Sequence, residues 1–231
     1  MNQSKIWDYY QGEGVDNFND AIPRLNYLFN KANKIISNDA STILNIGYGN
    51  GWVEKKCAQH NWKVFSLDPC HDQSKENTDE IMYVPGIIEK MPFPDNKFDI
   101  IFCSEVLEHL NDDELMCGMS EIKRTLKEDG VLIGTVPYKE NLAENIVVCP
   151  KCGDKFHRWG HHQEFDENKL HNIFEMNDLS VIELKSKAFR DYSQFTIKNF
   201  IKYMVRIPLG MIAPTLIYSN LFFISKKTSK Q

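Results

Sequence analysis

The 231-residue sequence lacks a long apolar run, an excess of basic residues and an export signal. No stretch reaches the roughly 18 apolar residues that a membrane-spanning helix needs. The most apolar late segment, residues 203–218, is interrupted by Arg206 and Pro214. The first five residues show no basic and then apolar pattern, so we expect a cytoplasmic location. The formal net charge of −5 argues against general nucleic-acid binding.

Internal repeats and low-complexity tracts are also absent. The chain is 42% hydrophobic and 26% charged, which is typical of a globular protein and enough to bury a core. It has six cysteines, and without an export signal we expect them to be reduced thiols rather than a disulfide framework. Only Cys149 and Cys152 stand at the spacing of metal ligands.

A glycine-rich stretch organises the rest of the chain. Residues 42–46 are apolar with β-branched members, which predicts a buried strand, and Gly47, Gly49 and Gly51 follow at alternate positions. A helix is expected directly afterwards. Glycines let the backbone approach a ligand closely, so a strand, tight turn and helix in this order predict a site for a nucleotide-like ligand.

Strands and helices alternate along the chain, which predicts a parallel sheet with helices on both faces. Asp68 ends the second strand, where an acid accepts hydrogen bonds from ribose hydroxyls. The expected strands are 42–46, 62–67, 82–84, 98–103, 131–136, 181–184 and 221–225. The expected helices are 25–36, 54–58, 167–176 and one that starts near 115 and ends at 129–130.

Several blocks between residues 42 and 137 resemble class I S-adenosylmethionine-dependent methyltransferases of the small bacterial, methyltransferase-11-like kind. The family's blocks occur in family order, whereas the spacing of the glycines and the later blocks argue against a nicotinamide oxidoreductase. The resemblance implies an α/β, three-layer, Rossmann-like fold with a seven-stranded, mostly parallel sheet and an antiparallel last strand. The matching blocks are 43–51, 66–69, 86–94, 98–101, 104–110 and 124–132.

The same resemblance assigns roles to individual residues. The glycines would wrap the methionine part of S-adenosylmethionine, Asp68 would hold the ribose, and the turn at 86–89 would lie along the adenine. Ser104 and Glu105 would line the methionine end. The implied cofactor-binding residues are Asn45, Gly47, Tyr48, Gly49, Gly51, Asp68, Pro69, Ile88, Glu89, Ser104 and Glu105.

Two positions depart from the family pattern. Asn45 stands where the family usually has an acid that helps to hold the cofactor's ammonium group, so the charge is lost there and affinity is expected to fall. Ile87 stands where an aspartate is common, which leaves Glu89 or a backbone carbonyl to meet the adenine amino group.

A second group of metal-ligand residues lies in residues 138–165, which we interpret as an insertion. Cys149 and Cys152 can hold one face of a tetrahedral ion, and His157 and His161 follow at helical spacing, which predicts a structural Zn²⁺ site. His162 can replace His161. The alternative is a reduced cysteine pair with surface histidines.

Glu105, Glu108 and His109 resemble a motif that binds a divalent ion in some O-methyltransferases. The alternative is that Glu108 and His109 orient the loop and shape the pocket. A hydroxyl acceptor needs a general base. The candidate catalytic residues are His109, Glu105 and Tyr138, together with whichever of the late histidines does not bind metal.

We expect one methyltransferase domain over residues 1–231, with a helical cap at 1–40, the insertion at 138–165 and a lid at 190–216. An apolar face edged with basic residues favours either peripheral membrane contact through 195–212 or a lid packed on the domain.

These features together predict methyl transfer to a small-molecule or sugar acceptor, such as a lipid-linked glycan, most simply as O-methylation. The alternative is a non-catalytic S-adenosylmethionine-binding or interaction module, favoured if Asn45 and Ile87 prevent turnover.

Overall fold

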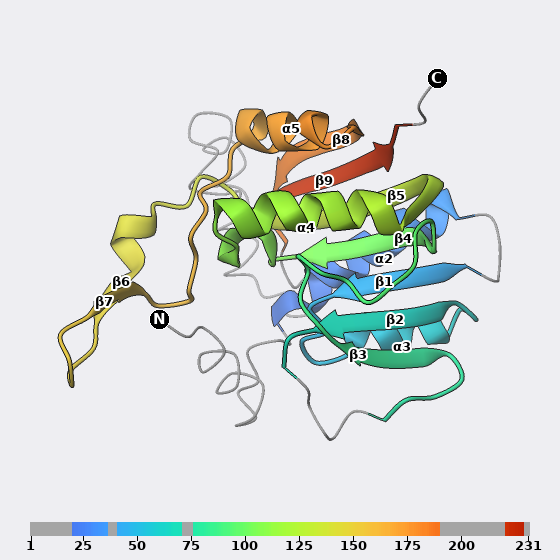
Figure 1. Cartoon of the computed structure of the whole chain (residues 1–231), viewed down its shortest axis with the longest axis horizontal. Coiled ribbons are helices and arrows are strands. Elements are labelled where there is room, and N and C mark those ends of the chain that lie inside the picture. The colour runs from blue at the N-terminus through green and yellow to red at the C-terminus, as the bar shows by residue number, and fades with distance from the viewer. Residues whose placement is uncertain (1–19, 37–40, 71–75, 190–219, 229–231) are drawn as a thin grey trace, which may run out of the picture.

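The computed structural model describes residues 20–36, 41–70, 76–189 and 220–228. Its centre is a seven-stranded sheet in the order β3-β2-β1-β4-β5-β9-β8 (Figure 1). The first five strands are parallel, and β9 lies antiparallel between β5 and β8, which confirms the predicted sheet. The strands are β1 (Thr42–Ile46), β2 (Lys63–Asp68), β3 (Ile81–Pro85), β4 (Phe98–Ser104), β5 (Leu126–Pro137), β8 (Leu179–Lys187) and β9 (Asn220–Lys227).

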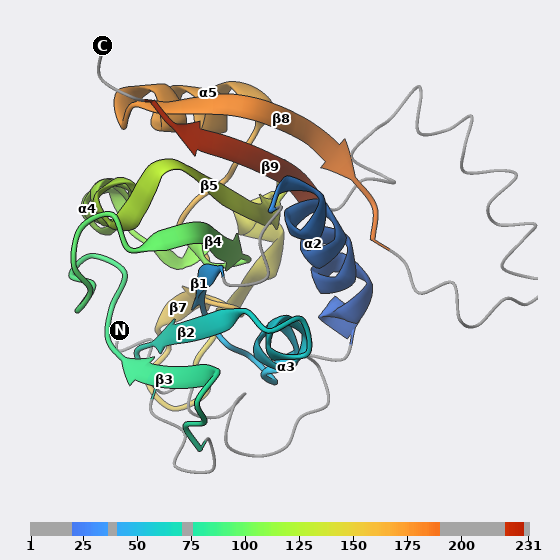
Figure 2. The same cartoon turned by 90° about the vertical axis from the view of Figure 1, so that its right-hand side faces the viewer.

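Helices cover both faces of this sheet, so the fold has the three layers that the sequence predicted (Figure 2). On one face lie α2 (Ile22–Ile35) and α3 (Trp52–Ala58), and on the other lie α4 (Asp112–Thr125) and α5 (Glu167–Met176). Each face has its own apolar cluster, because central parallel strands are buried on both sides.

The boundary between α4 and β5 differs from the prediction. The helix ends at Thr125, and β5 starts at Leu126, whose backbone is extended and pairs with Phe98. The helical spacing of Leu126 misled the prediction, since the residue continues the apolar stripe of α4 but is the first residue of the strand. Further along β5, Gly134 permits close pairing: a Cβ there would lie 1.7 Å from the Cys103 carbonyl oxygen.

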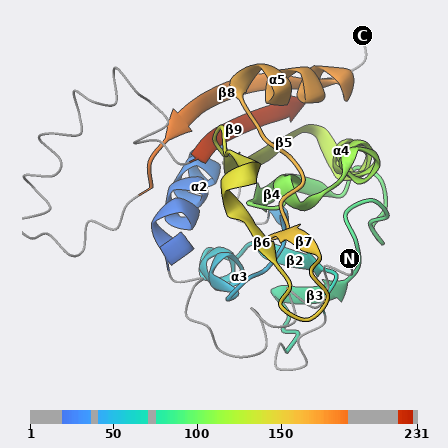
Figure 3. The same cartoon turned by 90° about the vertical axis from the view of Figure 1, so that its left-hand side faces the viewer.

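The segment after β5 lies at the end of the sheet towards which the parallel strands point (Figures 1 and 3). It contains a short 3₁₀ helix, η3 (Leu142–Asn145), and a hairpin of β6 (Ile146–Val148) and β7 (Lys155–His157). The segment is fastened to the loop after β4, because the backbone N–H groups of His162 and Gln163 both donate to the Glu108 carbonyl oxygen.

Several expectations fall outside the described residues. The lid at 190–216, the membrane contact through 195–212 and the first half of the cap at 1–40 belong to this group. Within the described part of the chain, no helix is both long and apolar enough to cross a membrane.

Candidate functional site

The glycine turn follows β1 at the end of the sheet that carries the other predicted cofactor residues. Gly47, Gly49 and Gly51 all have positive φ angles, of 77°, 50° and 77°. A Cβ on Gly47 would also lie 3.1 Å from the Val106 side chain. The turn therefore needs glycine for its conformation and for the close approach of the loop after β4.

Asn45 carries no charge itself, but it lies next to a carboxylate. Its side chain is buried, and its Nδ2 donates to Glu54 Oε1 over 2.7 Å. Ser66 Oγ donates to the same carboxylate oxygen over 2.5 Å. A fully buried carboxylate, Glu54 of α3, thus lies directly beside the position in β1 where the family usually has an acid. Asn45 serves this carboxylate as a donor, which sequence reasoning missed.

Asp68 ends β2 beside the glycine turn, as predicted. Its carboxylate is buried and accepts the backbone N–H groups of Tyr48 and Cys70, over 3.4 and 2.9 Å. The Tyr48 hydroxyl donates to the Cys70 carbonyl oxygen, so the ring closes over this corner. Pro69 follows at the surface. The acid is therefore held at a fixed angle at the edge where a ribose would lie.

The predicted adenine turn begins directly beside Asp68, since the Gly86 N–H donates to the Asp68 carbonyl oxygen over 3.0 Å. The Ile88 side chain is buried against Gly118 of α4, so only its backbone can meet a ligand. Ile87 is half-exposed, and Glu89 is partly exposed on the same turn.

Ser104 and Glu105 lie where the methionine end is expected, and both are engaged by a residue that sequence reasoning missed. Arg24 of α2 donates from Nε to Ser104 Oγ over 3.1 Å and lies 3.8 Å from the Glu105 carboxylate. Asn220 of β9 donates to the other oxygen of Glu105 over 3.0 Å. Glu105 has a positive φ of 56°, a strained conformation for a non-glycine residue. Only the fold reveals these partners, because both come from distant parts of the chain.

A cluster of carboxylates and histidines begins directly after Glu105. Glu108 and His109 come from the 3₁₀ helix η2 (Leu107–His109), and Glu140, His157 and His161 come from the segment after β5. Burial, reinforced by Glu105, raises the pKa of Glu108 well above its ordinary value. Burial, reinforced by His161, lowers the pKa of His109 to about 3, so this imidazole is neutral at physiological pH.

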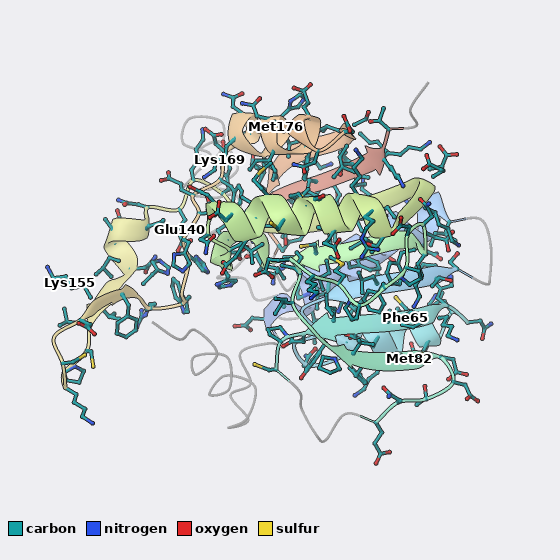
Figure 4. All side chains as sticks on the ribbon, viewed as in Figure 1. Phe65, Met82, Glu140, Lys155, Lys169 and Met176 are labelled. Atoms are coloured by element: carbon teal, nitrogen blue, oxygen red, sulfur yellow. The ribbon has the colours of Figure 1, made fainter. Side chains whose placement is uncertain are left out.

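The four residues predicted to share a zinc ion fall into two separate pairs. Cys149 and Cys152 lie at the turn of the hairpin, where the Gly153 N–H bonds back to the Cys149 carbonyl oxygen. His157 pairs with Ile146 at the opposite end of the hairpin and lies with His161 and Glu140. Figure 4 shows Glu140 near the sheet and Lys155 farther out on the hairpin. Among the described residues, the structure thus does not assemble the predicted Cys/His set.

The cysteine pair has its own electrostatics. Backbone N–H groups of Cys152 and Lys151 lower the pKa of the Cys149 thiol, which favours its thiolate.

Tyr138, the third catalytic candidate, is buried, and its hydroxyl interacts with Lys139 and Glu167. Lys139 and Glu167 are therefore the charged side chains that the structure places at the Tyr138 hydroxyl.

The fold and the site together are those of an α/β protein with a glycine turn after β1 and a carboxylate- and histidine-rich cluster after β4. Residues 44–134 match the Methyltransf_11 family, described as a methyltransferase domain. Over this part of the chain the sequence is similar to methyltransferases, and the sheet has the Rossmann-like arrangement of the class I methyltransferase fold.

Known relatives are similar over parts of the chain. An uncharacterized methyltransferase of Bacillus velezensis is 26% identical over 145 residues, covering 61% of this chain and 66% of the relative. A mitochondrial protein of Rattus norvegicus named arginine-hydroxylase NDUFAF5 is 30% identical over 113 residues, covering 47% of this chain and 32% of that protein. Relatives of this fold thus carry names for more than one reaction.

A solved structure agrees with the fold over nearly the whole chain. The 1,6-didemethyltoxoflavin-N1-methyltransferase of Burkholderia thailandensis, solved with S-adenosylhomocysteine bound, superposes with a TM-score of 0.70 at 13% identity. The superposition covers 98% of this chain and 87% of that protein. At this identity the likeness establishes the fold and leaves the acceptor open.

Proposed function

We propose that this chain transfers a methyl group from S-adenosylmethionine to a hydroxyl oxygen of a small-molecule or sugar acceptor. The observation that carries the proposal is the position of the buried cluster around Glu108 and His109, directly beyond Ser104 and Glu105 at the methionine end. Carboxylate and neutral imidazole groups can accept a hydrogen bond from a hydroxyl and orient its oxygen.

The described residues fit the cofactor. A glycine turn in which Gly47 has a positive φ and lies close to Val106, and a buried Asp68 at the end of β2, provide a close backbone approach and a fixed acceptor for ribose hydroxyls. When bound, S-adenosylmethionine supplies a methyl group on a cationic sulfur, which is a good leaving group. The protein therefore contributes mainly by positioning, and Arg24 fixes Ser104 and Glu105 for that purpose.

The acceptor hydroxyl must lose its proton during the reaction. Glu105 is held by Asn220 and Arg24, and the low pKa of His109 makes it a weak proton acceptor. The Tyr138 hydroxyl interacts with other charged side chains. His109 can thus orient the hydroxyl, but its activation calls for a further source of positive charge near the oxygen.

Other parts of the proposal rest on the sequence alone. These are a cytoplasmic location, a lipid-linked glycan as the acceptor and peripheral membrane contact through residues 195–212. A zinc ion at Cys149 and Cys152 would require ligands other than His157 and His161 in the observed arrangement.

The test uses S-adenosylmethionine with a ¹³C-labelled methyl group. The purified full-length chain is incubated with it and with panels of sugars, nucleotide sugars, catechols and amines, and labelled products are detected by NMR. The proposal predicts a methyl signal with the chemical shift of a methyl ether. Transfer to nitrogen or carbon would refute O-methylation, and cofactor binding without transfer to any acceptor class would favour the non-catalytic module.

A further inference from the structure

Two groups of potential metal ligands share His161. In the described part of the chain, the ligand atoms of Glu108, His109 and His161 lie within 4.8 Å of one another, and so do those of Glu140, His157 and His161. The hydrogen bonds of these residues distinguish the two groups.

Glu108 is the most unusual member. Its side chain is 1% exposed, and neither carboxylate oxygen has a hydrogen-bond partner among the residues that the structure describes. His109 Nε2 lies 4.0 Å from Glu108 Oε1. A buried carboxylate without donors is strongly unfavourable, and a bound cation would compensate it.

In His109 and His161, Nδ1 carries the ring hydrogen, so the lone pair of the neutral ring is on Nε2. His109 Nδ1 lies 3.4 Å from the Gly160 carbonyl oxygen, which can only accept, so Nδ1 carries the hydrogen. His161 Nδ1 donates to Glu140 Oε2 over 2.5 Å. In the neutral rings, Nε2 is then the nitrogen with a lone pair. Metal-binding histidines commonly donate their other N–H to a carbonyl or a carboxylate in this way.

His157 behaves differently. Its Nδ1 accepts the backbone N–H of His161 over 3.1 Å, so the hydrogen of the neutral ring lies on Nε2. That nitrogen faces Glu140 Oε1 over 3.5 Å. Glu140 therefore accepts a hydrogen bond from His161 Nδ1 and faces the Nε2–H of His157, which makes no hydrogen bond among the described residues. Because both imidazoles turn an N–H rather than a lone pair towards Glu140, this second group is a poorer ligand set than the first.

We propose that Glu108, His109 and His161 bind one divalent transition-metal ion, with Glu140 and the Gly160 carbonyl orienting the two histidines. Two imidazoles and one carboxylate suit ions such as Mn²⁺, Fe²⁺ or Zn²⁺ better than Mg²⁺ or Ca²⁺. The set differs from the one expected from the sequence, because the segment after β5 supplies His161, and Glu105 is engaged by Arg24 and Asn220.

Three protein ligands leave coordination positions open to an acceptor oxygen. An ion there would lower the pKa of a bound hydroxyl, whose proton would pass to solvent, and so would supply positive charge at the acceptor oxygen itself, whereas Arg24 is engaged by Ser104 and Glu105. This role rests on the proposed function, whereas metal binding itself does not.

The test titrates the EDTA-treated full-length chain with MnCl₂, followed by the EPR signal of free Mn²⁺, and with ZnCl₂ by calorimetry. We expect one ion per chain and a metal-dependent rise in Tm. Glu108→Gln and His161→Gln should raise the Kd at least about tenfold, and Glu140→Gln by about 10- to 100-fold. The matched controls are His171→Gln, at an exposed histidine of α5, and the pair Cys149→Ser with Cys152→Ser, all expected to leave the Kd unchanged.

S-adenosylmethionine binding, measured on every variant, separates loss of the metal site from misfolding. Absence of saturable ion binding to the wild type would overturn the proposal. So would loss of binding in the cysteine variant, or its loss in His157→Gln but not in Glu108→Gln. If the ion binds but its removal leaves the methyl-transfer rate unchanged, the role at the acceptor is wrong.

Discussion

The buried pair of Asn45 and Glu54 gives the sharpest test of how the glycine turn is supported. Replacing Asn45 by aspartate would restore the acid that the family usually has in β1. In this chain it would also place a second carboxylate about where Nδ2 now lies, 2.7 Å from Glu54 Oε1. We therefore expect Asn45→Asp to destabilise the protein and not to increase its affinity for S-adenosylmethionine.

The expected decrease in the free energy of unfolding depends on whether both carboxyl groups stay ionised or one of them takes up a proton. Two unit charges about 3 Å apart repel by about 5 kcal/mol at an effective dielectric constant of about 20. Alternatively, one carboxyl takes up a proton, which at pH 7 costs about 4 kcal/mol for a group with an ordinary pKa of about 4. Protonation of one carboxyl costs less than repulsion between two charges, so it sets the upper limit of the effect. The free energy of unfolding should therefore fall by about 2–4 kcal/mol at pH 7.

The pH dependence has a definite sign. A carboxyl whose pKa is raised in the folded state destabilises the fold above its unfolded pKa, and this penalty disappears as the pH falls towards that value. At pH 5 the loss should shrink to about 1–1.5 kcal/mol. Urea unfolding followed by circular dichroism at both pH values measures the difference.

A second substitution makes the reasoning refutable. Asn45→Asp combined with Glu54→Gln exchanges the amide and the carboxylate and should recover all but about 1 kcal/mol, a coupling of 2 kcal/mol or more. Asn177→Asp, at another buried asparagine, should not be rescued by Glu54→Gln. Additive effects of the two changes, or equal losses at both pH values, would show that Glu54 does not interact with the residue at position 45.

Three other predictions concern the sheet, the α4 connection and the ribose site. Gly134→Ala should lower the free energy of unfolding by about 3 kcal/mol or more, since its Cβ would lie 1.7 Å from the Cys103 carbonyl oxygen. Gly118→Ala should cost less, because its Cβ would meet only the Ile88 side chain, over 3.1 Å, and alanine favours the helix. Urea unfolding of both variants decides, and equal losses would contradict the account. Hydrogen bonds from Arg124 lower the pKa of Glu121, so Arg124→Gln should cost about 1–3 kcal/mol at neutral pH and less on acidification below about pH 4.5, as unfolding at both pH values would show; a loss independent of pH would refute this contribution. Asp68→Asn should raise the Kd for S-adenosylmethionine about tenfold or more and should also lower the Tm, because the amide has one acceptor oxygen for the two N–H groups of Tyr48 and Cys70; an unchanged Kd would remove Asp68 from the ribose site.

The sheet could be predicted from the sequence because each strand contains a short apolar run, and the runs of β1, β2 and β5 are followed by a glycine, an acid or a proline. Asp68 and the three glycines could be recognised because their roles are set by their immediate neighbours in the sequence. The glycines adopt positive φ angles in the turn directly after β1, and Asp68 is the last residue of β2. The end of α4 could not be predicted, because Leu126 satisfies a helical and a strand pattern equally well. Its pairing with Phe98 decides, and that contact is not local.

The site was predictable in its parts but not in its groupings. The sequence spacing predicted that one ion binds Cys149, Cys152, His157 and His161. In the structure, β7 is an extended strand that carries His157 away from the hairpin turn where the two cysteines lie. Antiparallel strands separate residues by about 3.4 Å per position, so eight residues along the sequence need not return to one ion. Arg24 had no sequence signal, because its partners Ser104 and Glu105 are about eighty residues away.

The central claim is that the glycine turn and Asp68 bind S-adenosylmethionine. Calorimetric titration of the full-length chain with S-adenosylmethionine, S-adenosylhomocysteine and NAD tests it most directly. The account predicts saturable binding of the first two with one site per chain, weakened by Asp68→Asn, and no binding of NAD. Failure to bind S-adenosylmethionine at high micromolar concentration, or binding of NAD in its place, would contradict it.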